Sequence, residues 1–121
     1  MLTALLAFSI IQSSAPLDEN QRGSYLFRAC QGTIRFQDAG VTGTNNDAAK
    51  SQFCVAYIGG FLDGLEMANS HAICTRNATM GTIARVYVAY MEKNPKDLDV
   101  EMPVGMLNAI MGAYPCPVKK R

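Results

Sequence analysis

Apolar residues recur at helical spacing in four separate segments of the chain. The first segment covers residues 17–31 and is followed by Gly32, a residue type that commonly ends a helix. The second starts near Asp47 or Ser51 and ends at Asn69-Ser70. Its apolar positions form one wide stripe, made of Phe53, Tyr57, Phe61, Leu65 and Ala68 with Cys54, Ile58 and Leu62 alongside.

The third and fourth segments have clearer ends. Thr79 is the expected N-cap of the third helix, and Asn94-Pro95 ends it because Pro cannot continue a helix. Pro103 suits the first turn of the fourth helix, and Pro115 ends that helix. The side chains expected to face inward are Ile83, Val86, Tyr87, Tyr90 and Met91 in the third helix and Leu107, Ile110 and Met111 in the fourth. The pattern predicts an all-α domain, a small four-helix bundle of up-and-down or orthogonal type.

The segment between the first two helices is rich in Gly, Asn, Asp and Thr. Residues 32–50 are therefore expected to form a long loop, with a short strand at Thr33–Phe36 as a weaker alternative. Loops of this length in a compact domain are usually functional or mobile. This loop is one candidate for a binding segment.

Glycines interrupt the second helix, where each interior Gly costs about 1 kcal/mol relative to Ala. Gly60 and Gly64 share one face because they are four residues apart. The fourth helix has its own small row at Gly105, Ala109 and Gly112 or Ala113. We expect these two helices to cross at short range. The alternative is that the glycines mark a hinge or a self-association face.

The four cysteines can be paired from the order of the helices. In an up-and-down arrangement Cys30 and Cys54 lie at the same end, whereas Cys74 lies about 18 residues, or roughly 27 Å, further along the second helix. A disulfide needs Cα atoms within about 7 Å, so Cys54 cannot reach Cys74. The fourth helix returns Cys116 to Cys74. The predicted pairs are Cys30–Cys54 and Cys74–Cys116.

The N-terminus differs in composition from the rest of the chain. Residues 2–11 are almost purely apolar but too few to span a bilayer, which needs about 20. They fit the apolar core of a secretory signal, followed by small residues at 12–15. We therefore expect a signal peptide at residues 1–15 and a single exported domain at residues 16–121. The alternatives are a buried N-terminal helix and a cytosolic protein with four free thiols.

The charged and polar side chains predict no active site. Eleven Lys and Arg stand against ten Asp and Glu, which excludes a nucleic-acid or polybasic membrane footprint. Cysteines at zinc-ligand spacing are absent, so no metal or cofactor is expected. His71, Asp63 and Glu66 are expected to be solvated. The seven methionines are expected to fill the core, with an adaptable client-binding face as the alternative. A binding role, and not an enzymatic one, is the expectation.

The order of these motifs resembles the Tai-like family of immunity proteins, which protect bacteria against peptidoglycan amidases delivered by type VI secretion. The resemblance covers residues 24–117. It rests on the residues Phe53-Cys54, Tyr57-Ile58, Gly60, Asp63, Thr79, Pro95 and Tyr114-Pro115-Cys116. Ala56 departs from the pattern where a Gly is common, as do Arg76-Asn77 where a Pro-containing turn is usual.

The resemblance implies a periplasmic protein, often a homodimer, that binds a cognate amidase and blocks its cleft. No family residue maps onto the exposed loops, so the contact residues are interpreted from charge alone. The acidic turn Asp97, Asp99 and Glu101 is the second candidate for partner binding. The rival interpretations are a small periplasmic chaperone, an exported helical binding protein with another role, and a small enzyme with a reactive free thiol.

Overall fold

The computed structural model describes residues 15–40 and 43–117. The expected signal peptide, except its last residue, lies outside the described residues. The described chain folds into four α-helices: α1 (Gly23–Ala39), α2 (Asn45–Met67), α3 (Met80–Lys93) and α4 (Met102–Ala113). Two short 3-10 helices, η1 (Glu19–Gln21) and η3 (Pro95–Asp99), precede α1 and follow α3. The predicted all-α class is confirmed.

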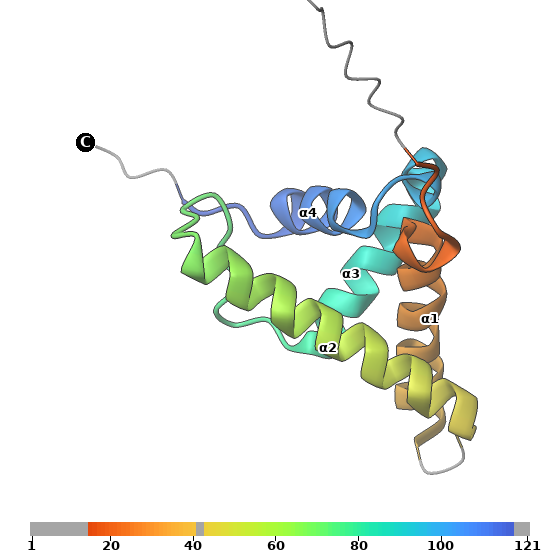
Figure 1. Ribbon diagram of the computed structural model, residues 1–121. Helices are drawn as coiled ribbons and strands as arrows, with labels where there is room; N and C mark the ends of the chain where they lie inside the picture. The colour runs from red at the N-terminus through yellow and green to blue at the C-terminus, as the bar shows by residue number, and fades with distance from the viewer. Residues whose placement is uncertain (1–14, 41–42, 118–121) are drawn as a thin grey trace, which may run out of the picture.

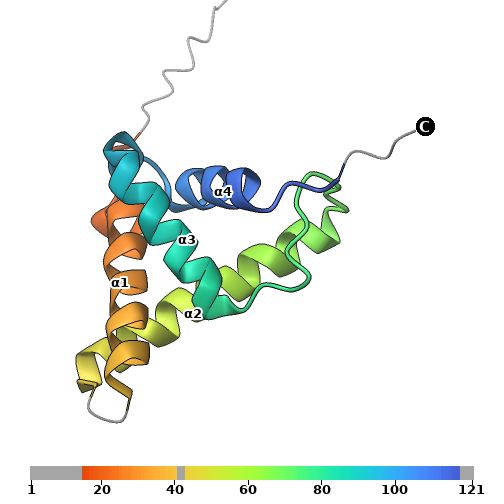
Figure 2. The same ribbon diagram turned by 180° about the vertical axis from the view of Figure 1, so that it is seen from behind.

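The helices cross one another steeply and do not run side by side (Figure 1). The long α2 passes across the end of α1, and α3 runs from α2 toward the far end of α1. Figure 2 shows from behind that α4 leaves the far end of α3 and returns above α2. Of the two arrangements that the sequence allows, the structure has the orthogonal one.

The first helix is longer than its pattern predicts. It continues through Gly32 to Ala39, so the expected helix end at Gly32 and the alternative strand at Thr33–Phe36 are both wrong. The buried positions Leu26, Ala29, Cys30 and Thr33 keep helical spacing across the glycine, which explains the continuation. Gly40 ends the helix, with a φ of 59° that favours glycine.

The second helix begins earlier than expected. Thr44 is its N-cap and accepts a hydrogen bond from the backbone N–H of Asp47 at 3.1 Å. The connection from α1 is therefore residues 40–44, and the long loop at residues 32–50 does not exist. Most of this segment, one of the two that the sequence offers for partner binding, is helical.

The later helix ends agree with the sequence. Thr79 caps α3 by accepting a hydrogen bond from the backbone N–H of Thr82, and Asn94 ends that helix before Pro95. Pro103 lies in the first turn of α4. These signals succeed because each acts on the residues next to it in the chain.

The core lies where α1, α3 and α4 meet, with α2 covering one side. Its completely buried members include Leu26, Ile58, Ile83, Tyr87, Met91, Met106 and Ile110. The Tyr87 hydroxyl donates a hydrogen bond to the Gly23 carbonyl at 3.1 Å, which ties α3 to the start of α1. The expected burial of Ile83, Tyr87 and Met91 is confirmed.

The inward face of α4 differs from the prediction. Ile110 is buried as expected, but Leu107 and Met111 are 37% and 45% exposed. The buried positions are Gly105, Met106, Ala109 and Ile110. Because α4 contains no charged residue, its hydrophobic pattern does not define which side faces inward. Its contact with α3 decides that orientation.

The expected close crossing of α2 and α4 is also wrong. A Cβ atom added at Gly60, Gly64 or Gly112 would meet nothing within 4 Å. Gly105 instead faces α3, where an added Cβ would lie 2.9 Å from the Met91 sulfur. The tight approach of α2 is to α1, because a Cβ at Gly32 would lie 2.6 Å from Cβ of Lys50.

Two disulfides join the predicted partners. Cys30–Cys54 links α1 to α2 with both residues completely buried. Cys74–Cys116 links the turn after α2 to the residues after α4, and the neighbouring backbones of Ile73 and Pro115 pair there as an isolated bridge. The predicted pairs form although the helices cross, because the α1–α2 contact still brings Cys30 to Cys54 and the residues after α4 still return to the turn after α2.

Candidate binding surface

The described residues hold no constellation for catalysis. His71, Asp63 and Glu66 are all exposed, as the sequence predicts. Within residues 15–40 and 43–117 no group of three His, Cys, Asp or Glu side chains could hold a metal ion, and all four cysteines are in disulfides. No described helix combines the length and the apolarity needed to cross a bilayer. The features of the described residues that remain are surfaces that could bind another protein.

The acidic turn is only partly available to a partner. Asp97 is 6% exposed and accepts hydrogen bonds from the Tyr90 hydroxyl at 2.6 Å and from Nδ2 of Asn108 at 3.4 Å. The bond to the Asp97 carboxylate, which favours the protonated phenol, raises the pKa of Tyr90. Asp97 thus joins η3 to α3 and α4 and has little accessible surface, and its expected role in partner binding stays a prediction.

The other two acids of this turn are exposed. Asp99 has a long ion pair of 3.9 Å with Arg22, and its side chain is 82% exposed. The backbones of Glu101 and Arg22 pair as an isolated bridge. The turn therefore offers two accessible carboxylates beside one arginine, which offsets part of their charge.

A row of aromatic side chains forms a second surface, which sequence analysis missed. It consists of Tyr25 on α1 and Phe53, Tyr57 and Phe61 on α2. The ring centres of Tyr25 and Phe53 are 5.2 Å apart edge to face, and the next two pairs are stacked at 6.4 Å each. Tyr25 and Phe53 are more than a third exposed. Partial burial raises the pKa of Tyr57.

The apolar stripe of α2 is too wide for one buried face, which is the signal that could have revealed this row. Only Cys54 and Ile58 of α2 are buried. Phe53, Tyr57 and Phe61 lie on the adjoining side, spaced four residues apart. The stripe is two positions wide, and α2 covers only one side of a small domain. One row of the stripe is therefore buried, and the other lies at the surface.

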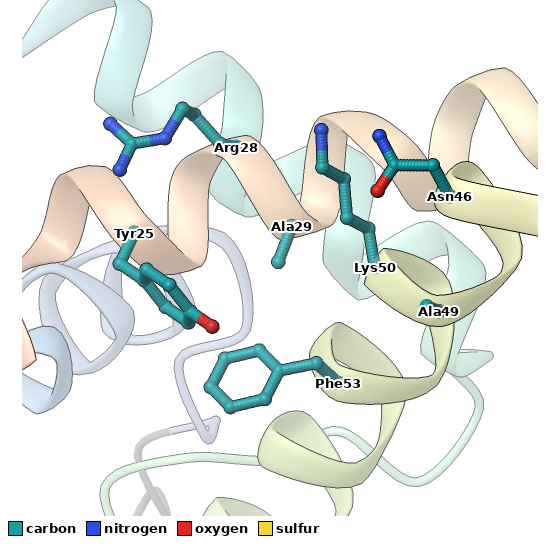
Figure 3. A pocket seen from close by; sticks show the side chains of 7 residues that line it. All are labelled: Tyr25, Arg28, Ala29, Asn46, Ala49, Lys50 and Phe53. Carbon is teal, nitrogen blue, oxygen red and sulfur yellow. The ribbon is translucent and has the colours of Figure 1, made fainter. Parts of the chain in front are cut away.

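A pocket of about 280 Å³ opens beside the aromatic row, between α1 and the first turns of α2. We call it the α1–α2 pocket; its lining residues are Tyr25, Arg28, Ala29, Asn46, Ala49, Lys50 and Phe53. Figure 3 shows the rings of Tyr25 and Phe53 together at one end and the side chains of Asn46 and Lys50 next to each other at the other. The lining contains two cations and no acid.

The charged groups around this pocket are partly paired. Arg28 makes an exposed ion pair with Glu19 at 2.8 Å, and Arg35 holds Asp47 at 3.0 Å. The hydrogen bond from Arg35 lowers the pKa of Asp47, which stays ionised at neutral pH. Lys50 belongs to none of the ion pairs among the described residues. Its ammonium group attracts the Asp47 carboxylate only weakly, so much of its positive charge is open to a partner.

Two further surfaces lie on α4 and beside the second disulfide. Val104, Leu107 and Met111 are exposed along the outward side of α4 at helical spacing. A wider hollow of about 540 Å³ lies beside the Cys74–Cys116 disulfide, lined mainly by residues of the 74–79 segment and by Tyr114 and Pro115. The hollow is shallow and holds no cluster of charges.

The described residues form a crossed helical domain that two disulfides clamp, with exposed aromatic and apolar rows that another protein could contact. Comparison with protein families identifies the kind of protein: a family model described as Rap1a immunity proteins matches residues 22–116, from the start of α1 to the last cysteine. The chain belongs to the Rap1a immunity protein family. Comparison with curated proteins and with solved structures finds no match.

The family membership places the protein among toxin-neutralising immunity proteins, whose partner is a cognate toxin. It is not a family of enzymes. The immunity class that the sequence resemblance implies is therefore confirmed.

Proposed function

We propose that this protein neutralises a peptidoglycan amidase by covering its active-site cleft. The observation that carries the proposal is the family match, which spans all four helices and all four cysteines. The amidase as target follows from the resemblance of the cysteine-flanked motifs to Tai-like immunity proteins. Inhibition by occlusion needs a rigid surface and no chemistry, which suits a domain whose described residues hold no catalytic constellation.

The proposed compartment is the periplasm. Disulfides persist in oxidising compartments, and one of the two here is buried at the junction of α1 and α2. Peptidoglycan lies in the same compartment, so the inhibitor and the substrate of the toxin would meet there. The resemblance also implies a homodimer, which light scattering of the oxidised protein would test.

The direct test measures hydrolysis of peptidoglycan by purified amidases of type VI secretion systems, with increasing amounts of the oxidised protein. We expect activity of one amidase to fall in proportion to added protein and to vanish near equal concentrations. The reduced and alkylated protein is the matched control, because it has the same sequence without the clamped fold. Full activity of every amidase at excess inhibitor would contradict the proposal.

One observation favours a second candidate, a periplasmic chaperone. Val104, Leu107 and Met111 on α4 and Met67 at the end of α2 are exposed apolar side chains that could hold unfolded clients. Unfolding followed from pH 7 to pH 2 separates the two functions. A chaperone would loosen reversibly in acid and then bind clients, whereas an immunity protein needs its native surface. If neither behaviour is found, the protein is an exported binding protein with another role.

A further inference from the structure

The α1–α2 pocket has the aromatic wall that protein interfaces use for anchoring. Tyr25 and Phe53 hold each other edge to face, so each ring loses little freedom when a partner contacts it. Tyr, Trp and Arg side chains that become buried near the centre of a protein interface supply much of its binding energy. The exposed area of these rings is therefore a surface on which a partner gains affinity.

The size of the pocket limits what can enter it. Its volume of about 280 Å³ lies just below the range of roughly 300–1000 Å³ typical of sites for whole small ligands. A single apolar side chain of a protein partner fits this space better than a cofactor does. Figure 3 shows the space bounded by the rings on one side and by the polar side chains on the other.

The charges at the pocket determine the kind of partner segment. Lys50 has no ion-pair partner among the described residues, and Arg28 shares its charge only with Glu19. Both members of that pair are largely exposed, at 48% and 80%, so the pair is weak and a partner carboxylate can replace Glu19. Asp47, the acid one turn before Lys50, is paired with Arg35, and the charge of Lys50 adds a weaker attraction to it. The pocket therefore complements negative charge.

From this geometry we infer that the α1–α2 pocket is the docking point for an acidic segment of the toxin. One apolar side chain of that segment packs against Tyr25 and Phe53, and flanking carboxylates meet Lys50 and Arg28. This inference rests on the proposed function and adds the surface by which the toxin is held. It moves the expected contact away from the acidic turn, whose charge has the opposite sign.

The first test uses two synthetic peptides, acetyl-Glu-Phe-Glu-amide and acetyl-Gln-Phe-Gln-amide, which differ only in charge. Nuclear magnetic resonance of the oxidised protein should show shifts at the amides of Tyr25, Lys50 and Phe53. We expect the Glu peptide to bind about five-fold more tightly at about 20 mM salt, and this advantage to disappear at about 500 mM salt. Equal binding of the two peptides, or shifts confined to other helices, would overturn the inference.

Four single variants distinguish peptide binding at the pocket from binding elsewhere on the surface. Lys50→Gln keeps most of the side-chain stem that packs against Gly32 and removes the charge. It should abolish the advantage of the Glu peptide, whereas the exposed Lys96→Gln should leave it intact. Phe53→Ala should weaken both peptides, whereas Met111→Ala on α4 should weaken neither. Identical effects of the pocket and control variants would count against the assignment.

The same variants in the amidase assay keep this inference distinct from the proposed function. If the unaltered protein inhibits an amidase and Lys50→Gln or Phe53→Ala weakens that inhibition about ten-fold or more, both stand. If all variants inhibit equally, the immunity function stands and the docking surface is wrong. If the peptides bind the pocket but no amidase is inhibited, the proposed function fails and the inferred toxin contact fails with it.

Discussion

Asp97 and Asp99 lie two residues apart in the same turn and have opposite roles. Asp97 is buried and accepts two hydrogen bonds that join η3 to α3 and α4. Asp99 is exposed, with only a long contact to Arg22. The sequence shows two similar carboxylates, and the difference between them comes from what packs around the turn.

Replacing these two acids should therefore have very different costs. Asp97→Ala leaves the Tyr90 hydroxyl without its charged partner, and we expect a loss of about 2 kcal/mol in the free energy of unfolding. Asp99→Ala should change it by less than about 0.5 kcal/mol. Urea unfolding of the three proteins measures both values. Equal stability of the two variants would show that the Asp97 contacts contribute nothing.

Because of Tyr87, the free energy of unfolding should depend on pH in the alkaline range. Burial raises the pKa of its phenol above the ordinary 10.0, so folding favours the protonated form. This contribution is complete below pH 10 and is lost as the pH rises through the folded-state pKa. We expect the free energy of unfolding to fall above pH 10 with a slope approaching about 1.4 kcal/mol per pH unit for this group.

Unfolding in urea from pH 8 to pH 11 tests the dependence on Tyr87. The variant Tyr87→Phe should start about 1 kcal/mol less stable, because it loses the hydrogen bond to Gly23, and should then decline less steeply. Parallel declines of the two proteins would mean that other groups cause the alkaline unfolding.

At the scale of the helices, glycines mark both a contact and an open surface. Gly32 lets α1 approach α2 at Lys50, which an added Cβ would prevent at 2.6 Å. Gly60 has no neighbour within 4 Å of the position that a Cβ would occupy. A glycine in a helix pattern does not reveal which of these applies, because the difference lies in the neighbouring helix.

Alanine at the two positions should have effects of opposite sign. Gly32→Ala forces α1 and α2 apart and should cost about 1–3 kcal/mol, since the obstructing atom is close to the backbone of α2. Gly60→Ala fills open space and should stabilise the protein by about 0.5–1 kcal/mol through better helix propensity. Thermal unfolding of both variants measures the signs. A loss of stability in Gly60→Ala would reveal a close contact at that face.

On the scale of the whole molecule, the two disulfides stabilise different contacts between segments of the chain. Cys30–Cys54 is buried in the α1–α2 contact, whereas Cys74 is exposed and Cys116 is half-buried beside the chain end. They close chain segments with separations of 24 and 42 residues. In the chain-entropy account these loops contribute about 3.5 and about 4 kcal/mol, which is large for one small domain.

Mild reductant should therefore open the two disulfides in order. We expect iodoacetamide to modify Cys74 and Cys116 first, because attack on a disulfide requires access to a sulfur atom. Cys30 and Cys54 should react only after the fold has opened. Mass spectrometry of peptides sampled over time measures the order. Early modification of Cys30 and Cys54 would show that α1 and α2 separate while the rest of the domain stays folded.

Sequence by itself determined the features that depend on neighbours in the chain. Helix period predicts the all-α class. Local stereochemistry predicts the Thr79 cap, the end of α3 before Pro95 and the start of α4 at Pro103. Helix order and helix length predict the cysteine pairing. The immunity class followed from the order of the motifs and agrees with the family match.

Only the tertiary structure decided which faces are buried. In the structure α1 continues through Gly32, so the long expected loop is absent from the described residues. Leu107 and Met111 are exposed, and Phe53 lies beside an open pocket. Asp97, one of the acids that the sequence assigned to partner binding, is buried. The physical reason is that an apolar or glycine-containing helix has several sides that could be covered. The helix that packs against it selects one, and that choice depends on residues distant in the chain.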